Sequence, residues 1–277
     1  MEYKATIVIL DFMKASRVLE NVRFIFSQKT NFEFEVIVID NSCNKNNAEI
    51  LKNGLKEYKN LRLIINEKNS GYIKAHNKAI AESSGKYIFM VNPDILFKEE
   101  LSFQKIIDFL DENPEIGILG PKQINDSGEI AITARAFPKL YIQVIRRTFL
   151  RSLPFLKKEV AYDEMRHLDF SKVQDVDWLQ SSCFVVRRDL WRKIGGFNEA
   201  YFLFMADVEL CFETWKINKR VVYYPDVQVY ADGKRLSAGG FCDFFKNWIL
   251  RQHVVDAIKY QLKHFLRANP RETYYKK

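Results

Sequence analysis

The stretch that decides the fold of this chain is Glu35-Val-Ile-Val-Ile-Asp40, followed by the polar residues Asn41-Ser-Cys-Asn44. Its uninterrupted run of β-branched residues predicts a strand that is buried on both faces. A similar run, Ala5-Thr-Ile-Val-Ile-Leu10, precedes it, and residues 16–26 between the two runs place apolar side chains at helical spacing. A strand, a helix and a second buried strand predict a parallel βαβ unit.

The same alternation continues along the chain. The predicted elements that follow are helices at 47–58, 71–83, 101–110, 189–194 and 207–215, and strands at 61–65, 87–91, 176–186 and 221–224. Residues 138–173 are basic and aromatic without a clear period, so we expect a loop-like excursion there. The pattern predicts an α/β fold with a Rossmann-like, mostly parallel sheet flanked by helices, whose sites lie at the carboxyl ends of the strands.

We expect a catalytic domain over 1–238, with a nucleotide-binding half at 1–98 and an acceptor-side half at 99–238, followed by a basic aromatic helical tail at 239–277. The chain has 277 residues, of which 47% are apolar, enough for a sizeable core. No run approaches the ~20 apolar residues that cross a bilayer, and the first residues do not read as a secretory signal. We therefore expect a cytoplasmic protein. The four cysteines stand far apart, which favours isolated thiols over a zinc site or disulfides.

The chain carries a formal net charge of +8, and basic residues alternate with aromatic ones in its last part. Such an excess suggests a polyanionic partner, which can be nucleic acid, an anionic membrane or a phosphorylated substrate. Amphipathic helices from 240–277 at the inner membrane surface are one interpretation. A helical pair packed on the catalytic domain is the other, and the two are compatible.

Polar side chains follow two of the predicted strands. Asp40, Asn41 and Ser42 offer a carboxylate, an amide and a hydroxyl suited to a pyrimidine or a ribose, although the same residue types favour turns and helix caps. Asn92-Pro-Asp94 follows a strongly apolar strand. A divalent cation prefers oxygen ligands and shares them with substrate phosphates, so Asp94 is a candidate metal ligand, with a simple proline turn as the alternative.

Two further segments suggest phosphate binding and proton transfer. Asn69 and Gly71 open a helix whose free N–H groups and Lys74 can meet a diphosphate, with Asn77 further along the same helix. Asp207 lies in an aromatic, apolar run, where partial desolvation raises the pKa of a carboxylate and suits it to general-base catalysis. Ordinary helix caps would explain either segment equally well.

In this order the segments resemble the family 2 inverting glycosyltransferases with the GT-A fold. Asp40-Asn-Ser matches that family's nucleoside-binding strand end, Asn69-Ser-Gly71 to Asn77 its helix start, and Asn92-Pro-Asp94 the position of its DxD metal motif. The segment from Trp178 to Arg187 and Arg188, then Gly195-Gly-Phe-Asn-Glu199, is similar to the acceptor side. Met205-Ala-Asp207-Val-Glu-Leu-Cys211 is similar to the segment that holds the catalytic base.

The resemblance implies a nucleotide-sugar donor, a glycan or lipid-linked glycan acceptor, and a divalent cation, Mg²⁺ or Mn²⁺. The Asn-Pro-Asp variant is similar to bacterial rhamnosyltransferases of surface polysaccharide synthesis, which implies dTDP-L-rhamnose as donor. Two departures put metal dependence in question: Ala206 stands where the family has an acidic residue, and Ala231 where it often has a histidine. Two alternatives follow: Asp94 holds the metal with the phosphates alone, or Asp232 substitutes for the missing ligand.

Three other interpretations compete with this one. The two alanines favour a nucleotide-sugar-binding protein without catalytic activity. A transferase with a different donor, such as a UDP-sugar, fits the same motifs. A nucleic-acid-binding protein would explain the basic aromatic tail. We disfavour it and expect no nucleic-acid partner, because carboxylates at the strand ends would face the phosphates.

Overall fold

A nine-stranded mixed sheet forms the centre of the computed structural model, which describes residues 3–139, 141–142, 145, 148–232, 248–265 and 267–276. The strands along the sheet are β3 (Leu61–Ile65), β2 (Phe34–Asp40), β1 (Ala5–Asp11), β4 (Tyr87–Val91), β10 (Cys183–Arg187), β5 (Ile116–Ile124), β11 (Arg220–Tyr230) and β8 (Gln174–Asp175), with β6 (Ile130–Ala131) beside β5. Strands β3, β2, β1 and β4 are mutually parallel, as the βαβ pattern predicts.

The second half of the chain is joined to the first through β10. This strand runs antiparallel to both β4 and β5, whereas β11 runs parallel to β5. A small separate ladder pairs β7 (Ala134–Arg135) with β9 (Trp178–Leu179). Because β10 lies between β4 and β5, residues 181–183 reach the same sheet edge as the end of β4.

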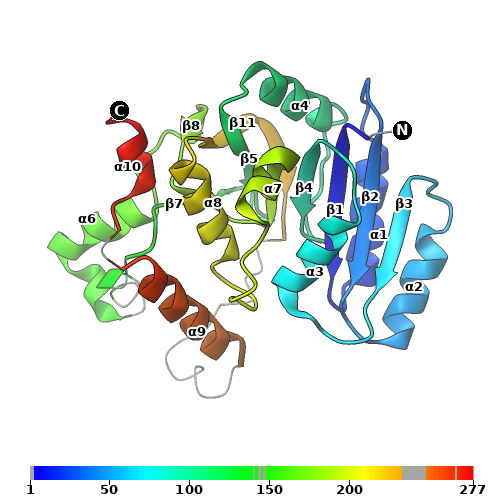
Figure 1. Ribbon diagram of the computed structural model, residues 1–277, viewed down its shortest axis with the longest axis horizontal. Coiled ribbons are helices and arrows are strands. Elements are labelled where there is room, and N and C mark those ends of the chain that lie inside the picture. Colours follow the sequence, from blue (N-terminus) through cyan, green and yellow to red (C-terminus); the bar gives the residue numbers. More distant parts are fainter. Residues whose placement is uncertain are drawn as a thin grey trace.

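Helices cover both faces of the sheet (Figure 1). The helices are α1 (Ala15–Phe26), α2 (Lys45–Leu55), α3 (Gly71–Ala81), α4 (Ser102–Glu112), α6 (Pro154–Asp163), α7 (Arg188–Ile194), α8 (Ala206–Lys216), α9 (Trp248–Lys263) and α10 (Pro270–Tyr274), with a 3₁₀ turn η1 (Phe149–Ser152). Helices α1, α2 and α4 share one core with the sheet, and α3, α7 and α8 share the other.

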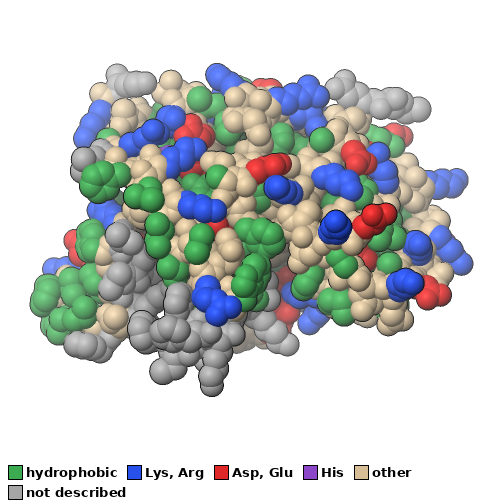
Figure 2. All heavy atoms as spheres, turned by 60° about the horizontal axis from the view of Figure 1, so that its bottom comes forward, with side chains coloured by type: hydrophobic (Ala, Val, Ile, Leu, Met, Phe, Trp, Pro, Cys, Tyr) green, Lys and Arg blue, Asp and Glu red, His purple; other side chains and the backbone are tan. Residues whose placement is uncertain are grey.

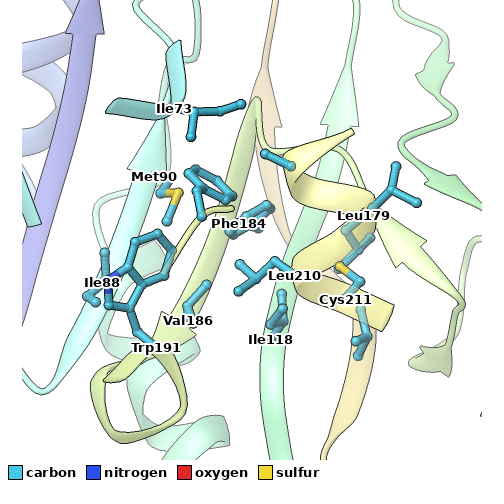
Figure 3. Packing of buried hydrophobic residues seen from close by; sticks show 14 of the residues in the cluster. Ile73, Ile88, Met90, Ile118, Leu179, Phe184, Val186, Trp191, Leu210 and Cys211 are labelled. Atoms are coloured by element: carbon cyan, nitrogen blue, oxygen red, sulfur yellow. The ribbon is translucent and has the colours of Figure 1, made fainter. Parts of the chain in front are cut away.

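Successive side chains along the central strands point to opposite faces of the sheet, so they belong to the two cores in turn. Ile7 and Ile9 pack with the α1, α2 and α4 side, while Val8 packs with the opposite side. Figure 3 shows the second cluster, in which Phe184 of β10 lies among side chains of β4, α3 and α8. All of these side chains are buried, so the continuous apolar runs reflect a sheet covered on both faces.

The structure differs from the expected elements in several places. The short strands β6, β7 and β8 were not predicted, and the strand expected at 176–186 is divided into β9 and β10. The 138–173 segment contains α6, which begins with Pro154 at its first turn, and η1, although the sequence indicated a loop. Most of α6 faces solvent, so its apolar residues do not mark one side at helical spacing. Strand β5 was also not predicted.

Candidate active site

The residues predicted to bind the nucleoside lie where β1 and β2 end. Parallel pairing places Asp11 directly beside Asp40, and both residues are buried. Asn47 of α2 joins them, since its Nδ2 donates to Asp11 Oδ2 at 2.5 Å and to Asp40 Oδ1 at 3.2 Å. Burial raises the pKa of Asp11, and the hydrogen bond from Asn47 opposes this shift. Asp40 Oδ2 is buried without a hydrogen-bond partner among the described residues, so it is the acceptor left for a donor on a ligand.

Asn41, Ser42 and Asn69 shape the loops around this pair. Asn41 Nδ2 donates to Asn69 Oδ1 at 2.8 Å, and Asn41 Oδ1 accepts from the backbone N–H of Ser70 at 3.1 Å. Ser42 Oγ accepts from the backbone N–H of Met13 at 2.7 Å. The amides of Asn41 and Asn69 are thus used to set the entry of α3, which leaves Asp40 as the residue of this motif with an unused acceptor.

The cavity next to these strand ends is lined by basic side chains at the start of α1. It has a volume of about 670 Å³, and Lys14, Arg17, Asn47 and Asp232 lie on its wall. Lys14 and Arg17 are the cations that can meet a diphosphate here. The sequence analysis did not single out either residue.

Lys74 and Asn77 lie elsewhere. Both line a separate groove of about 570 Å³ beside α7, and Lys74 is exposed there. Both amide atoms of Asn77 bind the backbone of Phe197, with Nδ2 donating to its carbonyl at 2.9 Å and Oδ1 accepting from its N–H at 3.0 Å. Asn77 therefore holds α3 against the glycine turn after α7, and the structure does not bring it to Asp94.

A pair of carboxylates lies at the end of β4. An antiparallel bridge joins Leu96 to Tyr230, which places Asp94 opposite Asp232. Burial and the neighbouring Asp232 raise the pKa of Asp94, while Lys14, 3.8 Å away, lowers it. Arg17 lies 3.9 Å from Asp232. Two facing carboxylates, each with a cation at ion-pair distance, provide the hard oxygen ligands that a divalent cation prefers.

Asp207 lies in the first turn of α8, on the other side of the same edge. Its Oδ2 accepts from the backbone N–H and the hydroxyl of Ser181 at 3.2 and 3.3 Å, and Tyr72 donates to that hydroxyl at 3.0 Å. Burial raises the pKa of Asp207, against these hydrogen bonds. Met205, just before α8, has a φ of 66°, in the left-handed region that costs energy for a non-glycine residue.

Residues 181 and 182 connect Asp207 to the carboxylate pair. Ser181 binds Asp207, and the carbonyl of Ser182 accepts from the backbone N–H of Asn92 at 2.8 Å. Asn92 thus fixes the turn that carries Asp94. Because β10 begins directly after this dipeptide, the groups expected to bind the donor and to activate the acceptor are held by one backbone segment.

Arg187 and Arg188 lie at the opposite edge of the sheet, because β10 pairs Arg187 with Tyr87 at the start of β4. The guanidinium group of Arg187 donates to the carbonyls of Ile116 and Asn113, at 2.6 and 3.0 Å. Arg188 donates to the carbonyl of Gly85. We therefore leave both arginines out of the acceptor side. Trp178 lies near Ser181, with its Nε1 donating to the carbonyl of Ala136 at 2.8 Å.

Several site residues escaped the sequence analysis. Asp11 could have been found, because it also follows a buried strand, as Asp40 does. Ser181 and Tyr72 carry no local signal, since their role depends on contacts with Asp207. Asp232 was named only as a substitute ligand.

The chain was compared with known proteins. The family model described as Glycosyl transferase family 2 matches residues 6–195, more than half of the chain. The chain belongs to glycosyl transferase family 2. This glycosyltransferase is 28% identical over 222 residues to the N-acetylglucosaminyl-diphospho-decaprenol L-rhamnosyltransferase of Mycobacterium tuberculosis, a match that covers 76% of this chain and 70% of that protein. It is 24% identical over 214 residues to the Escherichia coli rhamnosyltransferase WbbL, over 69% of this chain and 70% of WbbL.

Solved structures confirm the GT-A fold. A mannosyltransferase from Pyrobaculum calidifontis, solved in complex with GDP-Man and Mn²⁺, superposes with a TM-score of 0.60 at 16% sequence identity. That match covers 94% of this chain and 65% of the mannosyltransferase. The predicted fold class and the predicted family are thus both confirmed.

The two departures from the family pattern have structural consequences. Ala206, the first residue of α8, is 2% exposed and packs in the core. Asp232, next to Ala231, faces Asp94 and supplies an acidic oxygen there.

A second group of possible metal ligands consists of Glu209, Glu213 and His264. One ligand atom of each side chain lies within 4.8 Å of the other two. Glu209 is paired there with Lys263 and His264, so this group joins α8 to α9.

Proposed function

We propose that this glycosyltransferase moves L-rhamnose from dTDP-L-rhamnose onto a hydroxyl of a lipid-linked bacterial surface glycan, with inversion at the anomeric carbon. The observation that carries the proposal is the Ser181–Ser182 segment, which holds Asp207 and the Asp94 turn at one sheet edge. The names of the Mycobacterium tuberculosis and Escherichia coli relatives favour rhamnose as the sugar. The decaprenol in the first name favours a lipid-linked acceptor.

In the proposed mechanism, Asp207 accepts the proton of the acceptor hydroxyl as its oxygen attacks the anomeric carbon. The bond between that carbon and the diphosphate oxygen breaks in the same step, which inverts the configuration. Ser181 and Tyr72 orient the carboxylate, and the raised pKa of Asp207 strengthens it as a base. Lys14 and Arg17 oppose the negative charge that develops on the leaving diphosphate.

Asp94 and Asp232 are the proposed ligands of Mg²⁺ or Mn²⁺. When bound, the cation would neutralise charge on the donor diphosphate. Asp40 is proposed to accept a hydrogen bond from the nucleoside through its unpaired Oδ2. The proposed catalytic domain remains 1–238, with 239–277 as an added helical segment.

A donor panel tests the function. Purified protein is mixed with dTDP-L-rhamnose or UDP-sugars, with and without Mn²⁺, and thermal unfolding is recorded. A true donor at ~100 times its dissociation constant adds ~2.7 kcal/mol of stability. If only a UDP-sugar stabilises the protein, that UDP-sugar is the donor instead of dTDP-L-rhamnose. If none of the donors is bound, the proposed function fails.

The base assignment is tested separately with Asp207→Asn. Turnover should fall by ~10²–10⁴, the range for loss of a general base, while donor binding stays intact. Asp226→Asn, an exposed aspartate of β11, is the matched control. Turnover within about twofold of the unmodified enzyme would exclude Asp207 as the base, and the absence of any transfer by the unmodified enzyme would favour a binding protein.

A further inference from the structure

Helix α9 presents an apolar face to solvent. The large apolar side chains on it are exposed by 44–75%, namely Trp248, Val255, Ile258, Leu262 and, just beyond the helix, Phe265. At 3.6 residues per turn these positions fall within an arc of about 100°. Figure 2 shows exposed hydrophobic side chains beside Lys and Arg on the side of the molecule that comes forward from the bottom of Figure 1, where α9 lies.

The opposite face of α9 fixes this orientation. Ala257 and Tyr260 are buried in the core shared with α8. Asp256, with no exposed surface, accepts hydrogen bonds from the backbone N–H groups of Phe202, Leu203 and Phe204 at 3.0–3.4 Å. The helix therefore cannot turn its apolar stripe inward without breaking these contacts. A contiguous exposed apolar stripe of this kind marks an interaction surface.

We propose that this face of α9 lies in the boundary between head groups and acyl chains of an anionic lipid bilayer, parallel to the membrane plane. Arg251 lies within the same arc and is exposed. Interfacial helices combine an apolar face with such cations, which meet anionic head groups. Among the described residues no helix is long and apolar enough to cross a membrane.

The surface is next to the active-site edge. Trp248 contacts the ring of Phe202, with centroids 5.4 Å apart, and a Cβ on Gly71 would meet Phe202 within 2.9 Å. Gly71 opens α3 at the carboxyl ends of the strands, and residues 202–204 lead into α8 and Asp207. Docking through α9 would therefore bring the base to the membrane. The inference deepens the proposed function and rests on it for the acceptor, but lipid binding itself requires no sugar transfer.

The basic residues of α9 and α10 make contacts within the protein. The apolar face of α9 is therefore the better candidate for the membrane surface than these cations. Lys259 Nζ donates to the carbonyl of Ala200 at 2.7 Å, Lys263 pairs with Glu209, and Arg271 lies 2.8 Å from Asp177. These cations hold α9 and α10 on the domain, as the alternative of a packed helical pair predicts. The aromatic residues at 241–245 lie outside the described residues.

Cosedimentation of the full chain with vesicles tests the proposal. Vesicles of phosphatidylglycerol and phosphatidylethanolamine should pellet the unmodified protein, and Leu262→Glu should lower its lipid affinity by about tenfold or more. Leu101→Glu is the matched control, because Leu101 is 50% exposed just before α4, far along the chain from α9. Asp207→Asn should pellet like the unmodified protein, which separates lipid binding from transfer.

Three results would overturn the proposal. The full chain could remain in the supernatant at low salt. Leu262→Glu could pellet as well as Leu101→Glu. Lastly, size-exclusion chromatography could show a dimer that Leu262→Glu abolishes, without vesicle binding, which would assign the face to a second copy of this chain. Binding that persists in part at high salt would support apolar insertion, since screened cations alone would release the protein.

Discussion

Replacing Asp256 by alanine should destabilise the protein and slow turnover together. The Asp256 carboxylate accepts from the N–H groups of residues 202–204 and from Gln252 Nε2, at 2.9 Å. A hydrogen bond to a charged group contributes about 1.5–3 kcal/mol to stability. When several amides donate to the same oxygen, each of these hydrogen bonds contributes less. We therefore expect a loss of about 3–5 kcal/mol in the free energy of unfolding, since buried donors remain unpaired.

The assays are urea unfolding and steady-state turnover. At roughly 2–4 °C per kcal/mol for a chain of this size, the melting temperature should fall by about 6–20 °C. Turnover should fall by about tenfold or more, because residues 202–204 lead into α8, whose first turn carries Asp207, and small displacements of the proposed base are costly. Asp256→Asn keeps one oxygen acceptor and should lose less stability than Asp256→Ala.

Asp226→Ala, at an exposed position of β11, is the control for removing an aspartate. The reasoning is refuted if Asp256→Ala unfolds within about 1 kcal/mol of the unmodified protein, a difference too small for several lost charged hydrogen bonds. If stability falls and turnover of the folded fraction is unchanged, Asp256 holds α9 without positioning the base.

Three further outcomes follow from the site. Because burial raises the pKa of Asp207 above the ordinary value of 3.8, turnover should decline on acidification with its midpoint above that value, and full turnover at pH 3.8 would contradict the base assignment. Asp94→Ala and Asp232→Ala should each weaken nucleoside-diphosphate binding in titrations far more with Mn²⁺ than without it, whereas equal weakening would indicate a structural pair. Gly71→Ala should lower the free energy of unfolding, measured in urea, by at least about 1–2 kcal/mol, because the φ of Gly71 is +78° and the new Cβ would meet Phe202. A loss below about 0.5 kcal/mol would contradict this expectation.

The first half of the fold could be predicted because its signals are local. A strand covered on both faces needs an unbroken apolar run, and the runs ending at Leu10, Asp40 and Val91 supplied it. The polar residues directly after such runs mark the carboxyl edge in any parallel sheet. The predicted positions of Asp40 and Asp94 at this edge agree with the register of the strands.

The rest depended on contacts between distant segments. The pairing of Asp94 with Asp232 arises from the bridge between Leu96 and Tyr230, which no local pattern announces. Arg187 seemed an acceptor-side residue by its place in the sequence. The antiparallel direction of β10, which periodicity does not reveal, carries it to the other edge.

The position of β10 has a consequence for how this chain is made. Strand β4 is buried along its whole length, yet one of its edges is covered by a strand that begins only at Cys183. Until that segment has left the ribosome, the nascent chain holds an apolar strand with an open row of hydrogen-bonding groups, which is a template for pairing with other chains. A fragment ending near residue 98 should therefore aggregate when expressed alone, and the two halves of the catalytic domain would have to mature as one unit.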